Sequence, residues 1–101
     1  MANQYVILAR SERPGDGLPE LGTREEIVRE LANSNVAPEV PEGDVLYGPG
    51  IRLEFPPGID PVNQILLSIM EDEIAWLVIL RLAKKFGWRI LDTATGREFS
   101  P

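Results

Sequence analysis

The sequence has no cysteine and no histidine among its 101 residues. Without cysteine there is no disulfide framework and no thiol chemistry. Without histidine the chain lacks the commonest general base and the commonest transition-metal ligand, and a Ser-His-Asp triad is excluded. We therefore expect no transition metal and no cofactor. We also find no set of catalytic residues, so an enzymatic role is disfavoured.

Long basic clusters and long apolar runs are missing as well. Sixteen acidic against ten basic residues give a net charge of -6, which repels phosphate backbones, so we expect no nucleic-acid partner. The apolar run at residues 74–80 is far shorter than the roughly 20 residues that a bilayer requires. Residues 1–10 have none of the features of a signal peptide. We expect a soluble cytoplasmic protein without a membrane partner.

What remains is an ordinary globular composition, 44% hydrophobic and 26% charged. A chain of 101 residues is near the commonest domain size, so residues 1–101 are predicted to form a single α+β domain. A domain this small buries one core and leaves no room for a deep internal active site.

The first half of the chain predicts three strands and a helix. The apolar run in residues 4–10 is typical of a strand at the centre of a sheet or covered on both faces. Thr23 and Glu26 have the spacing of a capping box and predict a helix over residues 24–32. Residues 44–47 and 51–55 flank a Gly-Pro-Gly sequence and predict a hairpin.

The second half predicts a long helix from Pro61 to Phe86. Its apolar face moves by about a quarter turn at residues 71–73, where three acidic residues follow one another. Ser68 and Glu71 have capping-box spacing, so the main helix is expected to begin near Ile69. Either one kinked helix or two helices end to end fits the pattern, and we favour the break.

The chain closes with a predicted strand at residues 88–92, a turn at 93–96 and a short extra strand at 97–99. The resulting order is strand, helix, strand, strand, helix, strand. It predicts a ferredoxin-like βαββαβ sandwich, an antiparallel sheet with two helices on one face. In that arrangement the first and third strands lie side by side in the centre of the sheet.

Three groups of residues could carry chemistry, and each has a simpler structural interpretation. Residues 71–73 are carboxylates, but consecutive helical positions point about 100° apart, so they indicate a helix start rather than a metal site. Residues 92–96 indicate a tight turn rather than an anion site. The glycine loops at 15–17 and 48–50 match no nucleotide-binding motif.

The tryptophans point to an interaction surface. Trp76 lies in a stretch that is apolar nearly all round, whereas a helix in a two-layer domain buries only one face against its sheet. The apolar side chains that the sheet does not cover need another partner to bury them: the first helix, another subunit or a different protein. We expect a homodimer or another protein partner. The interface candidates are Trp76, Leu77, Leu80 and Trp88.

These features favour a non-enzymatic protein-interaction or regulatory module. One alternative is a domain that binds a small molecule or performs catalysis on an open sheet face. Another is an acidic inhibitor, such as an immunity-type protein that masks a basic enzyme.

Overall fold

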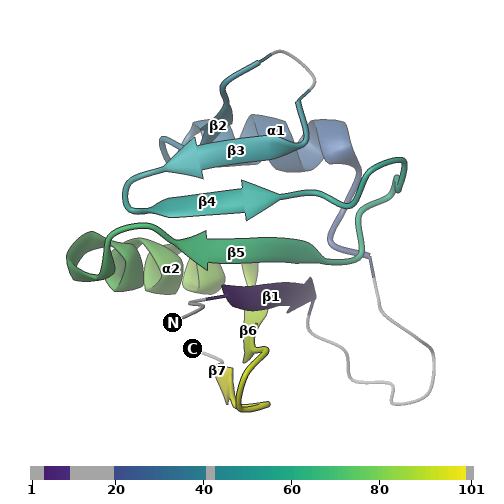
Figure 1. Cartoon of the computed structure of the whole chain (residues 1–101). Helices are drawn as coiled ribbons and strands as arrows, with labels where there is room; N and C mark the ends of the chain where they lie inside the picture. The colour runs from purple at the N-terminus through teal and green to yellow at the C-terminus, as the bar shows by residue number, and fades with distance from the viewer. Residues whose placement is uncertain (1–3, 10–19, 41–42, 100–101) are drawn as a thin grey trace.

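The computed structural model describes residues 4–9, 20–40 and 43–99. Over these residues the chain forms two helices and an antiparallel sheet with strand order β2-β3-β4-β5-β1-β6-β7 (Figure 1). The α+β class predicted from the sequence is confirmed. The elements in chain order are β1 (Gln4–Ala9), α1 (Arg24–Ala32), β2 (Ala37–Pro38), β3 (Val45–Gly48), β4 (Ile51–Glu54), β5 (Ile65–Ile69), α2 (Asp72–Phe86), β6 (Trp88–Asp92) and β7 (Glu98–Phe99).

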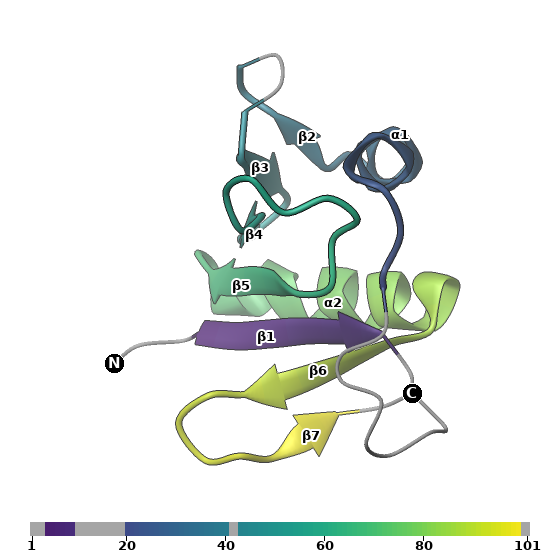
Figure 2. The ribbon, with the colours of Figure 1, turned by 90° about the vertical axis from the view of Figure 1, so that its right-hand side faces the viewer.

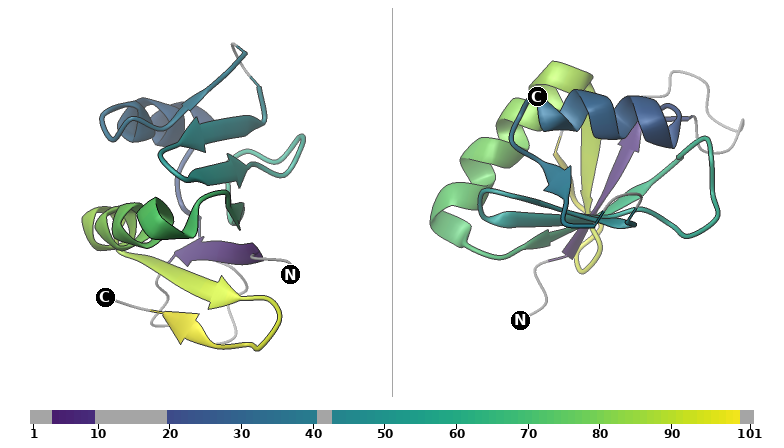
Figure 3. Two further views of the ribbon diagram at one scale, coloured as in Figure 1. Left: turned by 60° about the vertical axis from the view of Figure 1, so that its left-hand side comes forward. Right: turned by 90° about the horizontal axis from the view of Figure 1, so that it is seen from above.

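Both helices cover the same face of the sheet. Helix α1 lies over the end formed by β2, β3 and β4, and α2 lies across β5, β1 and β6 (Figure 1, Figure 3). Strand β1 is central, between β5 and β6, as its apolar run predicts (Figure 2). The core fills the space between the helices and this face. Its largest fully buried side chains are Ile7, Leu31, Leu46, Ile51, Leu53, Ile65, Leu67, Ile79 and Ile90.

The ferredoxin-like topology is wrong. In that fold the first predicted strand would pair with the third, here β1 with β4, but β5 lies between them and pairs with both. The extra strand comes from residues 65–69, which were predicted to be helical. Both versions of the long helix, kinked and broken, are therefore incorrect before residue 71, and Ser68 is a strand residue rather than a helix cap.

The reason for this error is the short, mostly apolar sequence of β5. Val62, Ile65, Leu66 and Ile69 share helical spacing, but Ile65 and Leu67 are 0% and 1% exposed while Leu66 between them is 45% exposed. That alternation has the period of a strand. A short apolar run is compatible with either period, and pairing with strands on both sides decides in favour of the strand.

Helix α2 begins where the acidic residues predict a boundary. Asp72 and Glu73 lie in its first turn and Lys84 and Lys85 in its last, so both ends suit the helix macrodipole. The β3–β4 turn holds the start in place, since the carbonyl of Gly50 accepts hydrogen bonds from the N–H groups of Met70 (2.7 Å) and Glu71 (3.1 Å). The helix ends at Gly87, whose φ of 71° is the left-handed conformation typical of helix ends.

The other local predictions that fall on described residues are confirmed, whereas the glycine loop at residues 15–17 lies outside them. The Thr23 and Glu26 capping box is present at the start of α1. Strands β3 and β4 form the hairpin, with Gly48 opposite Ile51. The Asp92 carboxylate accepts a hydrogen bond from the Ala94 N–H at 2.8 Å and forms the predicted tight turn. Strand β7 then pairs back onto β6. Within the described residues, neither helix has the length and apolar character to cross a membrane.

Candidate interaction surface

Helix α2 has apolar side chains on two opposite faces. Its inner face, Ala75, Ile79, Leu82 and Ala83, is buried against the sheet. On the other side Ile74, Leu77 and Leu80 are 42%, 58% and 52% exposed. At 100° per residue these three fall within one arc of the helix together with three charged residues. We call this arc the α2 outer face; it consists of Glu73, Ile74, Leu77, Leu80, Arg81 and Lys84.

The four predicted interface residues divide into two groups. Leu77 and Leu80 lie together on the α2 outer face, as an interface requires. Trp76 is half-buried and packs edge-on against Tyr5 of β1, with ring centroids 5.3 Å apart. Trp88 is only 4% exposed and stacks on Phe86 at 4.7 Å, so it belongs to the core.

Ile74 was missed as an interface candidate. A helix that begins near Ile69 and carries two apolar stripes does not single this residue out. Once α2 starts at Asp72, Ile74 lies one turn before Leu77 on the same face. The three-residue spacing between Ile74 and Leu77, which places both on one helix face, was the signal that could have found it.

The charges of the α2 outer face are divided between its ends. Glu73 lies at the acidic amino-terminal end, and Arg81 and Lys84 lie at the basic carboxy-terminal end. All three side chains are exposed. Within residues 4–9, 20–40 and 43–99, none of the three forms an ion pair or a side-chain hydrogen bond. They are available to another molecule.

Tyr5 connects this helix to the centre of the sheet. Burial raises the pKa of its phenol, and the carboxylates of Asp92 and Asp72 raise it further. Its hydroxyl therefore stays protonated at neutral pH, and the residue acts as a packing partner for Trp76 rather than as a charged group.

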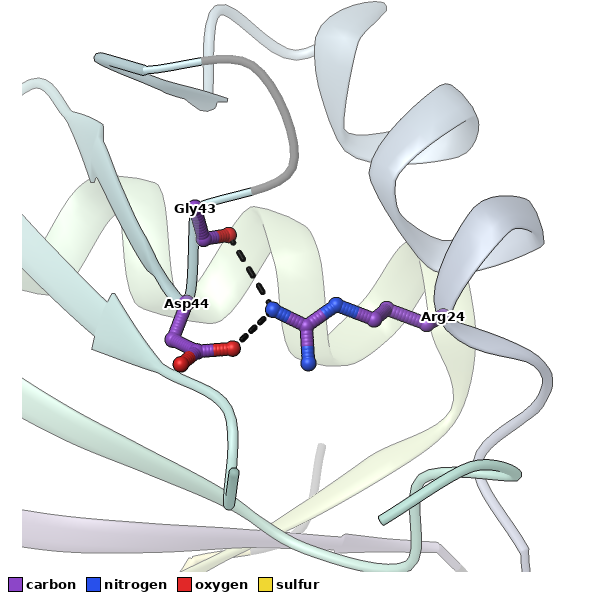
Figure 4. A network of polar contacts seen from close by, with 3 residues as sticks. All are labelled: Arg24, Gly43 and Asp44. Carbon is purple, nitrogen blue, oxygen red and sulfur yellow. Dashed lines mark hydrogen bonds and ion pairs between the residues drawn. The ribbon is translucent and has the colours of Figure 1, made fainter. Parts of the chain in front are cut away.

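A cluster of polar contacts lies at the start of α1 (Figure 4). The guanidinium of Arg24 binds the Asp44 carboxylate and donates to the Gly43 carbonyl at 3.2 Å. It also covers the ring of Phe55, 5.1 Å from the centroid. The Arg24 backbone N–H donates to the Asp60 carboxylate at 3.0 Å. These contacts join α1 to the sheet, so the function of Arg24 is structural.

The capping box next to this cluster lowers the pKa of one carboxyl group, that of Glu26. The Thr23 hydroxyl donates to Glu26 at 2.7 Å and the Thr23 N–H donates at 3.3 Å. These two hydrogen bonds lower the pKa of Glu26 below its ordinary value. The shift reflects helix capping and marks no catalytic acid.

A hollow of about 400 Å³ lies on the open side of the sheet, lined in part by Val6, Val45, Glu54 and Leu66. Glu54 is already paired with Arg52 at 2.9 Å, and the nearby Asp44 is paired with Arg24. The hollow therefore offers an apolar surface whose two carboxylates are both engaged. Gln64 is the other polar side chain that lines it, so the hollow has little with which to orient a polar substrate.

Residues 71–73 form the start of a helix and no cation site. In the part of the chain that the structure describes, no group of three acidic side chains is arranged to hold a metal ion.

Comparison with protein-family models, with curated proteins and with solved structures gives no match.

Proposed function

We propose that this protein is a non-enzymatic protein-interaction module that binds its partner through the α2 outer face. The observation that carries the proposal is the exposure of Ile74, Leu77 and Leu80 on one side of a helix whose other side is fully packed. Three large apolar side chains in neighbouring turns form a contiguous patch, which is typical of a binding surface. Scattered single apolar residues would carry no such meaning.

The free energy of burying these apolar side chains also favours a binding surface. Complete burial of a leucine side chain stabilises a protein by about 1.5–3 kcal/mol relative to full exposure. Leu77 and Leu80 are more than half exposed, so much of this free energy is not gained in the isolated chain. A partner that covers the outer face gains it on binding.

The charges of the surface favour a partner with both signs of charge. An inhibitor of a basic enzyme would present a uniformly acidic face. The α2 outer face instead has Glu73 at one end and Arg81 and Lys84 at the other. The interaction module is therefore a better fit to this surface than an acidic masking protein, despite the net charge of -6.

Site-specific photo-crosslinking tests the proposal. A photoreactive amino acid is placed at position 77, at position 80 or at position 66, in separate variants expressed in the native host. Leu66 is the matched control, because it is also a leucine with about half of its side chain exposed but lies in the sheet. We expect discrete protein adducts from positions 77 and 80 and none from position 66. Absence of adducts at 77 and 80, or equal adducts at all three positions, would contradict the proposal.

Measurement of the free energy of unfolding complements the crosslinking. If the outer face serves binding, Leu77→Gln and Leu80→Gln should each change the free energy of unfolding of the isolated chain by no more than about 0.5 kcal/mol. A much larger loss would show that these leucines are required for folding.

A further inference from the structure

We propose that the partner is a second copy of this chain, paired through an antiparallel contact between the two α2 helices. This inference rests on the proposed function and identifies the molecule that covers the α2 outer face. It is based on the spacing of the residues along the helix and on their charges.

Four residues of the outer face follow the spacing of a helix–helix seam. Glu73, Leu77, Leu80 and Lys84 are separated by four, three and four residues. This is the alternation of the two inward-facing positions of a coiled coil, which keeps one line of side chains toward a neighbouring helix. The buried residues of α2 lie on the opposite side, so the seam is free for a neighbour.

The seam is complementary to itself when one copy is reversed. In an antiparallel pair, Leu77 lies opposite Leu80 of the second copy, and Leu80 lies opposite its Leu77. The same alignment places Glu73 opposite Lys84 of the second copy at both ends. The contact then has two apolar pairs in the middle and two ion pairs outside, related by a two-fold axis between residues 78 and 79.

Other pairings of two copies fit less well. A parallel pair would place Glu73 against Glu73 and Lys84 against Lys84, two repulsive contacts. The antiparallel pair also aligns the positive end of each helix macrodipole with the negative end of the other.

The contact between the two helices is short, which favours weak association. From residue 73 to residue 84 the helix rises about 16 Å, so the seam extends over roughly three turns. An interface of this length belongs to the small class, and we expect a dissociation constant of roughly micromolar order.

Charge exchange between two variants tests the pairing. Glu73→Lys places lysine against Lys84 of the other copy at both ends, and Lys84→Glu places glutamate against Glu73 at both ends. Each variant alone should dimerise at least about 10-fold more weakly than the wild type at low salt, since two attractive pairs become repulsive. A 1:1 mixture restores opposite charges at both ends, and its dissociation constant should return to within about 3-fold of the wild-type value. Sedimentation equilibrium measures all three samples, and circular dichroism checks that each variant is folded.

The outcomes distinguish the antiparallel dimer from the more general proposal of a protein-interaction module. A wild-type dimer whose two variants dimerise normally, or whose mixture stays monomeric, overturns the antiparallel pairing. A wild-type chain that is monomeric at millimolar concentration overturns self-association altogether. In either case the interaction module is judged by crosslinking: adducts from positions 77 and 80 with a different protein support it, and the absence of adducts removes it.

Discussion

Trp76 packs edge-on against Tyr5, with ring centroids 5.3 Å apart and ring planes at 82°. The contact directs the largest side chain of α2 toward the central strand of the sheet and away from solvent. Leu77, the next residue along, is more than half exposed. Neighbouring residues of one helix therefore have different environments: Trp76 supports the fold, and Leu77 is left for the binding role that we propose.

This division predicts opposite results for two alanine substitutions. Trp76→Ala should lower the free energy of unfolding by about 2 kcal/mol or more, because it removes a half-buried aromatic contact and leaves a cavity. Leu77→Ala should lower it by no more than about 0.5 kcal/mol. Urea denaturation of both variants, at a concentration where the chain is monomeric, measures the difference. Equal losses would show that Leu77 also supports the fold.

The Gly50 contact with α2 predicts a second difference. Gly50 and Gly58 both have a φ of 73°, so alanine at either position costs about 1–2 kcal/mol of backbone strain. A Cβ at Gly50 would also lie 3.0 Å from the Glu71 carbonyl oxygen and 3.1 Å from the Ala75 nitrogen, whereas a Cβ at Gly58 meets no atom within 4 Å. We expect Gly50→Ala to be less stable than Gly58→Ala by at least about 1 kcal/mol. Thermal denaturation of the matched pair provides the comparison, and equal melting temperatures would argue against a tight β3–β4 turn at the start of α2.

Strand β5 is tested by two adjacent leucines. Leu67→Ala should destabilise the fold by about 2–5 kcal/mol, because Leu67 is 1% exposed. Leu66→Ala should cost less than about 1 kcal/mol, because 45% of its side chain is exposed. A helix over the same residues would place Leu66 on the buried side and reverse the order. Chemical denaturation of the two variants distinguishes the strand from the helix.

Local signals in the sequence were sufficient for most elements. The capping box at Thr23, the glycines around the β3–β4 turn and the turn at Asp92 each fix backbone conformation through hydrogen bonds within a few residues, so they can be read without knowledge of the fold. The topology could not be read in this way. The residues of β5 have no period of their own that distinguishes strand from helix, and their structure depends on pairing with β1 and β4, which are distant in the sequence.

The candidate surface was predictable in part for the same reason. The surplus of apolar residues around Leu77 and Leu80 is visible in the sequence, and both side chains are exposed in the structure. The position of each tryptophan depends on tertiary contacts, with Tyr5 for Trp76 and with Phe86 for Trp88. No pattern within α2 reveals these contacts, so residue type alone suggested two interface anchors that the fold uses elsewhere.

The capping box predicts a pH dependence. Because Thr23 holds the pKa of Glu26 below its ordinary value of 4.5, the ionised carboxylate stabilises the folded chain at neutral pH. That contribution is present above pH 4.5 and is lost as the pH falls through the lowered pKa. Glu26→Gln removes the titrating group, so its melting temperature should lie below that of the wild type at pH 7 and approach it at low pH. Thr23→Ala should cost about 0.5–2 kcal/mol at pH 7. A constant difference between wild type and Glu26→Gln at every pH would contradict this role for Glu26.

The concentration dependence of the molar mass tests the proposed α2 interface most directly. Sedimentation velocity of the wild type from about 1 µM to 1 mM should show the mass rising from the 11.2 kDa of one chain toward twice that value. Leu77→Glu, which places a charge in the middle of the seam, should remain at 11.2 kDa over the same range, while Leu66→Glu on the open side of the sheet should behave as the wild type. A wild-type mass of 11.2 kDa at every concentration, or loss of the dimer in Leu66→Glu alone, would contradict the proposed interface.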